Sequence, residues 1–128
     1  MKEETVKICP FCKANLTLDQ LVNDPLIRPI GMMFGEGNIE HAYYFFHHDT
    51  DNCGTTFIVN VLTFTPCITE PIPQEKLTLT EPCERHCVNL NDLLECKQPC
   101  FFAPYRRFLI RMIHIKGRAK PGVMVTTE

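Results

Sequence analysis

The chemistry that this chain can perform is concentrated in its cysteines. Eight of its 128 residues are cysteine, and thiolate ligands select Zn²⁺ or iron–sulfur clusters. The first residues contain no apolar segment that could act as a secretion signal, so we expect a cytoplasmic protein. In a reducing compartment, paired cysteines bind metals or do redox chemistry more often than they form stable disulfides.

The first group of candidate ligands begins with Cys9 and Cys12. A C-x-x-C turn lets two sulfurs face one ion, and a tetrahedral zinc site needs two further ligands. We expect these from a later strand end that contains His47, His48 and Cys53. Adjacent strand residues point to opposite faces, so one histidine at most is a ligand. His48 is the assigned candidate and His47 the alternative.

This combination of a C-x-x-C turn and a hairpin ending in Cys53-Gly54 resembles a zinc ribbon or a treble-clef-like zinc domain. The resemblance covers about residues 8–65 and implies an N-terminal zinc knuckle. A single His–Cys pair stands where a second C-x-x-C is usual. The sequence Cys9-Pro-Phe-Cys12 also fits a thioredoxin-type redox pair. That motif needs a preceding buried strand in a βαβ unit, and only eight residues precede Cys9.

The second group of candidate ligands consists of two C-x3-C pairs, which are Cys83, Cys87, Cys96 and Cys100. Residues four apart project from one face of a helix, so two such pairs could converge on one ion. We favour a second zinc, with His86 as a possible replacement ligand and an iron–sulfur cluster as an alternative. The spacing also resembles twin C-x3-C hairpins, which implies the disulfides Cys83–Cys100 and Cys87–Cys96. Cys67 is expected outside both groups, as a small buried apolar residue.

The elements that must position these residues form an α+β fold. Three runs rich in β-branched and aromatic residues predict an antiparallel meander, and they span residues 27–34, 41–48 and 55–64. The second run carries large apolar side chains on both faces, as a central strand does. The turn between the second and third strands lies at the same end as the start of the first. Cys53 should therefore approach the Cys9–Cys12 turn.

Helices are predicted before and after this meander. A short helix over residues 16–23 has Thr17 as its N-cap, and the clearest helix is Ala103–Lys116, closed by Gly117. Further helix starts are expected at Thr80 and Asn91, a short strand over residues 76–80, and a tail over residues 121–128. We divide the chain into a zinc-ribbon-like lobe (1–66), a Pro-rich connector (67–80) and a Cys-rich helical C-terminal lobe (81–128).

Charge is distributed unevenly along the chain. Residues 1–70 carry four Lys or Arg and nine Asp or Glu, whereas residues 105–128 carry six basic residues and one acid. Arg107, Arg111 and Arg118 line one stripe of the C-terminal helix and could contact nucleic acid. The net charge of −2 opposes attraction to a polyanion, so we favour a protein contact for this stripe. No stretch has the length of apolar residues needed to span a membrane.

We therefore expect a zinc-stabilised binding or regulatory module that contacts a protein partner or a second copy of itself, and not an enzyme. No catalytic residue is assigned, because the sequence contains no paired carboxylates, phosphate-binding loop or nucleophile elbow. The alternative is a redox, electron-transfer or hydrolytic subunit that uses a metal bound by cysteine and histidine.

Overall fold

A three-stranded antiparallel sheet forms the centre of the molecule. In the computed structural model, which describes residues 4–35, 38–50, 53–77, 79–81, 83 and 85–119, its strands are β3 (Ile27–Gly35), β4 (Asn38–His48) and β5 (Thr56–Asn60). The order β3-β4-β5 confirms the predicted meander with the second strand in the centre. The third strand is shorter than predicted, because the 3₁₀-helix η1 (Val61–Cys67) begins after Asn60. The Asn60 side chain accepts a hydrogen bond from the Leu62 amide at 2.8 Å and so starts the helical turn.

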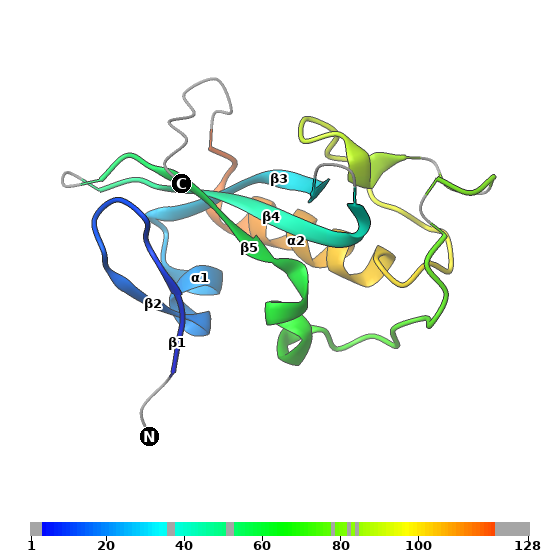
Figure 1. The fold of residues 1–128 in the computed structure, drawn as a ribbon, viewed down its shortest axis with the longest axis horizontal. Coiled ribbons are helices and arrows are strands. Elements are labelled where there is room, and N and C mark those ends of the chain that lie inside the picture. The colour runs from blue at the N-terminus through cyan, green and yellow to red at the C-terminus, as the bar shows by residue number, and fades with distance from the viewer. Residues whose placement is uncertain are drawn as a thin grey trace.

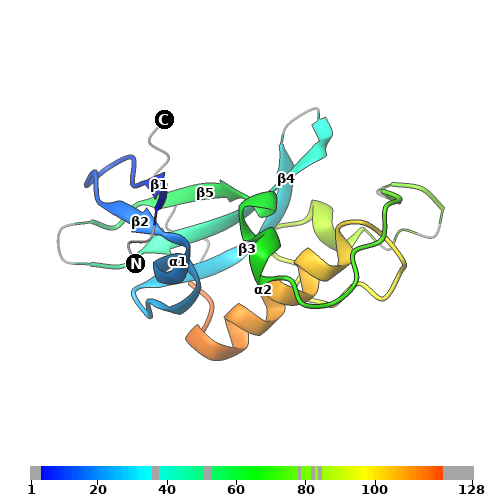
Figure 2. The same ribbon diagram turned by 90° about the horizontal axis from the view of Figure 1, so that it is seen from below.

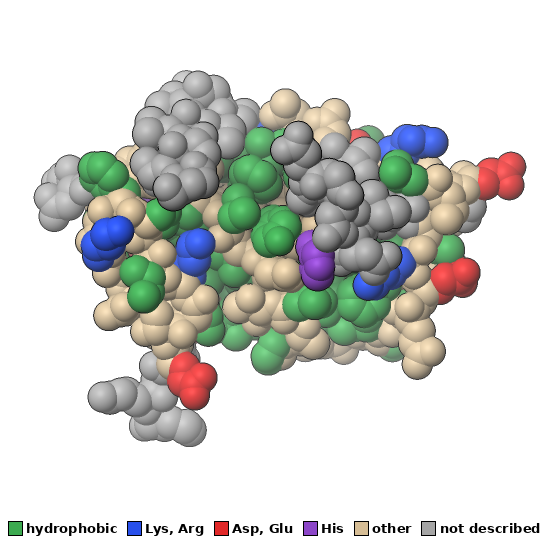
Figure 3. Space-filling view, viewed as in Figure 1, with side chains coloured by type: hydrophobic (Ala, Val, Ile, Leu, Met, Phe, Trp, Pro, Cys, Tyr) green, Lys and Arg blue, Asp and Glu red, His purple; other side chains and the backbone are tan. Residues whose placement is uncertain are grey.

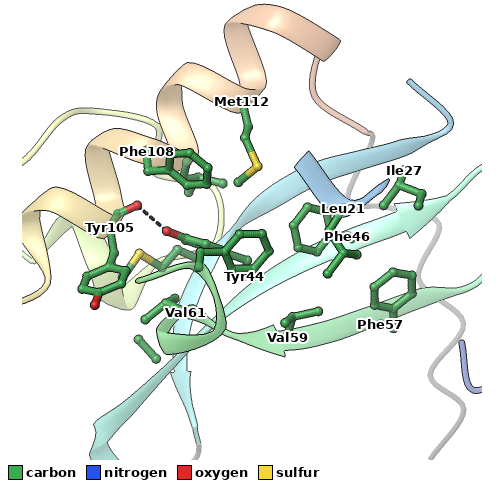
Figure 4. Close-up of a cluster of buried hydrophobic side chains, with 14 of the residues drawn as sticks. Leu21, Ile27, Tyr44, Phe46, Phe57, Val59, Val61, Tyr105, Phe108 and Met112 are labelled. Atoms are coloured by element: carbon green, nitrogen blue, oxygen red, sulfur yellow. Dashed lines mark hydrogen bonds between the residues drawn. The ribbon is translucent and has the colours of Figure 1, made fainter. Parts of the chain in front are cut away.

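Alternate residues of β4 form one face of the strand, and this face supplies the aromatic centre of the core. Tyr44 and Phe46 are fully buried, and Phe46 stacks between Phe57 and Phe64. The Tyr44 hydroxyl donates to the carbonyl oxygen of Tyr105 at 2.6 Å, which satisfies a buried polar atom (Figure 4). This bond ties the central strand to the C-terminal helix.

Two small elements precede the sheet. Strands β1 (Thr5–Ile8) and β2 (Asn15–Thr17) form a hairpin that the sequence analysis did not predict. Helix α1 (Leu18–Asn23) follows, with Thr17 as N-cap as predicted. The Thr17 hydroxyl accepts from the Gln20 amide at 3.2 Å, and the Gln20 side chain accepts from the Thr17 amide at 2.8 Å. This capping box fixes the junction between the hairpin and the helix.

Helix α2 (Ala103–Lys116) has the predicted boundaries and lies along one side of the sheet (Figures 1 and 2). Its apolar face is buried as expected from the spacing of its residues, which are Tyr105, Phe108, Leu109 and Met112. Gly117 follows the last turn with φ of 85°, a value that side chains disfavour. None of the described helices is both long and apolar enough to cross a bilayer.

The segment between η1 and α2 is irregular, which corrects three predictions. Within its described residues, the only helical turn is the 3₁₀-helix η2 (His86–Val88), so the strand over residues 76–80 and the two helices are wrong. Side chains compete with helical hydrogen bonds here, because Asn89 and Asp92 each accept from the amide two residues further on, at 2.9 Å. Arg85 also adopts a left-handed conformation with φ of 66°.

This irregular segment is tied directly to the sheet. A Cβ atom at Gly31 would overlap the carbonyl oxygen of Leu90, so glycine permits a close approach between β3 and the loop. Arg118 joins the same two parts, since its guanidinium donates to the Ile30 carbonyl at 2.7 Å and to the Asn91 side chain at 3.0 Å. The predicted division into two lobes and a connector stays a prediction, and the predicted tail lies outside the described residues.

Candidate metal centre

Two hairpin turns meet at one end of the sheet and bring four candidate ligands together. Cys9 follows β1, Cys12 lies in the same turn, His48 ends β4, and Cys53 lies in the turn before β5. Their ligand atoms all lie within 4.8 Å of one another. The topological argument made from the sequence, that the β4–β5 turn reaches the C-x-x-C turn, agrees with this arrangement.

Two distances inside this group are close to the edges of a tetrahedral zinc site. The Cys9 and Cys53 sulfurs are 3.6 Å apart, and the Cys12 sulfur lies 3.6 Å from Nδ1 of His48. With metal–sulfur and metal–nitrogen bonds typical of zinc, a regular tetrahedron has edges of about 3.8 Å between two sulfurs and about 3.6 Å between sulfur and nitrogen. The four atoms are therefore spaced closely enough to surround a single ion.

The β1–β2 turn holds its two cysteines through backbone hydrogen bonds. The Cys9 amide donates to the Ala14 carbonyl at 3.0 Å, and the Lys13 amide donates to the Cys9 carbonyl at 3.0 Å. Lys13 has φ of 67°, which turns the chain back immediately after Cys12. Both sulfurs are consequently presented from one tight loop whose own backbone is hydrogen-bonded.

The β4–β5 turn holds the other two ligands in the same manner. The His48 amide donates to the Thr55 carbonyl at 2.9 Å, and Cys53 exchanges two backbone hydrogen bonds with Thr50. The Phe57 ring and the His48 imidazole form a T-shaped pair with centroids 6.5 Å apart. These contacts fix where the His48 ring and the Cys53 sulfur lie.

The structure also chooses between the two adjacent histidines. His48 is buried beside the cysteines, whereas His47 points to the opposite face of β4. The Nδ1 atom of His47 is buried and has no hydrogen-bond partner in the described part of the chain. His48 is therefore the histidine that the fold places in the candidate centre.

The candidate centre is enclosed by protein. Cys9, His48 and Cys53 are buried, and Cys12 is partly exposed. Four candidate ligands would fill a tetrahedral coordination shell, which is the arrangement of structural zinc sites rather than of catalytic sites with an open position. The chemistry offered by this donor set is thus tight binding of a soft or borderline divalent cation.

The second group of cysteines lies at the opposite end of the molecule, in the loops that precede α2 (Figures 1 and 2). Its four sulfurs do not converge as closely as those of the first group, but all four residues line one cavity of about 20 Å³. The remaining lining residues are Leu77, Arg85, His86, Gln98 and Ala103. All eight cysteines lie in the described part of the chain, and none is in a disulfide.

Two backbone amides point at sulfurs of this second group. The Leu77 amide donates to the Cys100 sulfur at 3.2 Å, and the Arg85 amide donates to the Cys83 sulfur at 3.3 Å. Burial raises the pKa of Cys87 to about 12, and the positive charge of Arg106 opposes that shift. The helical i, i+4 presentation predicted for these cysteines is wrong, because neither pair lies in an α-helix.

Arg106 was missed by the sequence analysis. It is fully buried within α2, where Nε donates to the Leu94 carbonyl at 2.8 Å and Nη2 lies 3.2 Å from a carboxylate oxygen of Asp92. Burial lowers the pKa of Arg106, and Cys87, Asp92 and Cys96 act against that effect. The sequence signal for its burial was its position on the helix, because it lies four residues after Phe102 and four before Ile110, which are both buried.

The predicted basic stripe is largely engaged within the chain. Arg107 forms a bidentate ion pair with Glu70, whose pKa it lowers, and Arg118 binds the backbone beside β3. Arg111 is exposed and lies over the Phe108 ring at 5.6 Å. On the face of the molecule seen in Figure 3, the described Lys and Arg side chains lie apart from one another.

Cys67 stands apart from both groups of cysteines. It ends η1 and lines an open groove beside α1, together with Leu18 and Val22. It is only partly buried, and burial raises the pKa of its thiol.

The chain has no significant match among protein-family models, curated proteins or solved structures.

Proposed function

We propose that this chain is a zinc-stabilised binding or regulatory module that contacts another protein or a second copy of itself. The observation that carries the proposal is the convergence of three cysteines and one histidine, all from hairpin ends, within 4.8 Å. A closed site of this kind contributes free energy to folding instead of turning over a substrate.

Zinc is the ion that the donor set fits best. Three thiolates and one imidazole form a soft, tetrahedral environment, and such S/N sites are typical of Zn²⁺. The sulfur–sulfur and sulfur–nitrogen spacings of 3.6 Å lie close to the tetrahedral edges expected for this ion. In this proposal the β1–β2 turn is the zinc knuckle, and the β4–β5 turn completes a zinc-ribbon-like centre.

The surface beside this centre supports a role in protein contacts. Phe11 lies between the two cysteines of the knuckle and is 57% exposed, and Ile8 at the end of β1 is 55% exposed. A bound ion would hold these apolar side chains on a rigid turn, which reduces the entropy lost when a partner orders them. Exposed apolar residues held in this way are suited to the centre of a small interface.

A hydrolytic function has less support from the geometry. Metal-assisted hydrolysis needs a coordination position for water or substrate. Here the four converging protein atoms are enough to complete a tetrahedral shell without water. Electron transfer would require a redox-active metal in place of zinc, since Zn²⁺ has no redox chemistry.

The proposal is tested by changing the exposed apolar side chains while leaving the ligands intact. The variant Phe11→Ser with Ile8→Ser should keep the zinc content and melting temperature of the native protein. It should lose self-association in sedimentation velocity, or retention of a defined partner in quantitative affinity purification, by at least about tenfold, which corresponds to 1.4 kcal/mol.

The matched control is Ile115→Ser, because Ile115 is a 79% exposed apolar residue on α2, far along the chain from the knuckle. This control should bind as the native protein does. Equal association by the native protein and the Phe11→Ser, Ile8→Ser variant would contradict a contact surface at the knuckle. A native protein without zinc would contradict the metal centre itself.

A further inference from the structure

We propose that Cys83, Cys87, Cys96 and Cys100 bind a second, single Zn²⁺ ion as a four-thiolate centre, and that the buried guanidinium of Arg106 provides its counter-charge. This centre is separate from the knuckle and does not depend on the function proposed for it.

The size of the shared cavity favours a single ion. Four cysteines from two stretches of the chain line one enclosed volume of about 20 Å³. A cavity of at least about 10–15 Å³ is needed to hold one water molecule, so this volume admits one small occupant. Thiols are weak hydrogen-bonding groups and hold water poorly, whereas their thiolate forms bind a soft cation strongly.

The backbone around this cavity is arranged to support thiolates. The amides of Leu77 and Arg85 donate to the Cys100 and Cys83 sulfurs, at 3.2 and 3.3 Å. Hydrogen bonds to a charged group favour its charged form, and metal binding requires the deprotonated sulfur. The left-handed conformation of Arg85, with φ of 66°, accompanies the bond from its amide to Cys83.

Arg106 provides an independent reason to expect negative charge at this place. Its side chain is 0% exposed, and its Nη1 atom has no hydrogen-bond partner among the described residues. Its Nε atom donates at 2.8 Å to the carbonyl oxygen of Leu94, which lies two residues before the cavity-lining Cys96. The Asp92 carboxylate is shared, because it also binds the His86 ring at 2.9 Å. A buried cation with an unsatisfied donor calls for a further anion nearby.

A zinc ion with four thiolates supplies that anion, because two positive and four negative charges leave a net charge of −2. With neutral thiols or a pair of disulfides, Asp92 would be the one ion-pair partner of this guanidinium among the described residues. The buried charge of Arg106 therefore favours a metal-bound form of this cavity over an oxidised or a metal-free one.

The decisive measurement is the zinc content of the full chain, purified anaerobically with reductant and assayed by elemental analysis and native mass spectrometry. The native protein should carry two zinc ions, and the Cys87→Ser, Cys96→Ser variant should carry one. The control Cys67→Ser removes a cysteine outside both groups and should keep two. A Cys12→Ser variant should retain the second ion alone, which separates this proposal from that for the knuckle.

The role of Arg106 is tested by the affinity of the second ion in competition with a chromophoric chelator. Loss of a supporting residue around a metal typically costs about 10–100-fold in affinity, and we expect this for Arg106→Met. The affinity of the knuckle should not change in the same protein. Arg106→Lys should recover part of the loss, and Arg111→Met, which removes an exposed charge from the same helix, should have no effect.

Several results would overturn the proposal. A native protein that binds one zinc in the presence of excess metal, and loses it through Cys12→Ser, has no second centre. Stoichiometric iron with acid-labile sulfide would replace the single ion by a cluster. Four thiols of this group that remain unreactive after denaturation, and react only after reduction, would show disulfides. The zinc stoichiometry, the iron and sulfide content and the thiol reactivity are all measured on the native protein, so they stay decisive even where the cysteine variants do not fold.

Discussion

The two groups of cysteines differ in what positions their sulfurs. In the candidate metal centre of the knuckle and the β4–β5 turn, ladder and turn hydrogen bonds of two hairpins hold Cys9, His48 and Cys53, and the four candidate ligand atoms already converge. At the other end of the molecule, Cys83 and Cys100 lie on irregular backbone around a small cavity, without such convergence. A hairpin can form its ligand geometry before an ion arrives, whereas loops depend on the ion to close around it.

Metal removal should produce the largest difference between the two regions, and the difference should appear in their amide-exchange protection. We expect chelation to abolish the amide-exchange protection of residues 83–100 while β4 and α2 keep much of theirs. The binding free energy of structural zinc in small domains reaches about 10–16 kcal/mol, and it is available to these loops only when the ion is bound. Hydrogen–deuterium exchange with and without chelator measures this directly. Equal loss of protection in the sheet and in the loops would remove the distinction.

Replacing one ligand in each region should sharpen the comparison. Cys12→Ser should remove one zinc and lower the free energy of unfolding by several kcal/mol, because binding energy is also folding energy. Cys83→Ser should loosen its own loop and leave the knuckle's zinc in place. Metal analysis and chemical denaturation of both variants give the result, with Cys67→Ser as control. A full metal content in Cys12→Ser would contradict the knuckle.

Adding a methyl group at Gly31 should disturb only the second region. The new Cβ would overlap the Leu90 carbonyl oxygen, which is backbone and cannot move aside as a side chain can. Overpacking of this kind costs about 1–3 kcal/mol. Chemical denaturation of Gly31→Ala should show this loss, with reduced affinity for the second zinc and unchanged affinity at the knuckle. Native-like stability would mean that the loop is not held against β3.

The smallest expected effect on stability comes from the ion pair between Arg107 and Glu70. Arg107 also contacts the second region, because its guanidinium donates to the Cys96 carbonyl oxygen. Both side chains are partly exposed, so solvent screens the pair. A double-mutant cycle with Arg107→Met and Glu70→Gln should give a coupling of about 0.2–1 kcal/mol. A coupling near zero, together with salt-sensitive nucleic-acid binding that Arg107→Glu abolishes, would instead favour the nucleic-acid contact.

The regular elements were largely readable from the sequence. Periodicity and caps located α1 and α2, since Thr17 and Gly117 are strong local signals. The meander followed from its aromatic and β-branched runs, and its topology brought Cys53 to the C-x-x-C turn. The choice of His48 over His47 needed the structure, because the sequence alone does not determine which face of β4 meets the knuckle.

The second region was less predictable because its conformation is set by local side chains and distant contacts. The C-x3-C spacing favoured helices, but Asn89 and Asp92 cap their own turns and prevent them. The β1–β2 hairpin is short and lacks a clear alternation of apolar residues. Nothing in the spacing of charges revealed that Arg106, rather than its neighbours, is the buried arginine.

The order of residues in β4 has a consequence for how the sheet chooses its pairing. From position 43 to 48 the strand consists of doublets, two tyrosines, two phenylalanines and two histidines. A slip by one residue could put Tyr43, Phe45 and His47 in the places of Tyr44, Phe46 and His48, which would leave the residue types of the buried face unchanged, although such a slip normally exchanges core and solvent faces. The residue types of that face consequently do not discriminate between the two registers. A bound ion could, because a slip would change the number of residues between the candidate histidine ligand and Cys53. An ion bound at the knuckle would thus favour one register of β4 over the other, where the residue types of the strand do not.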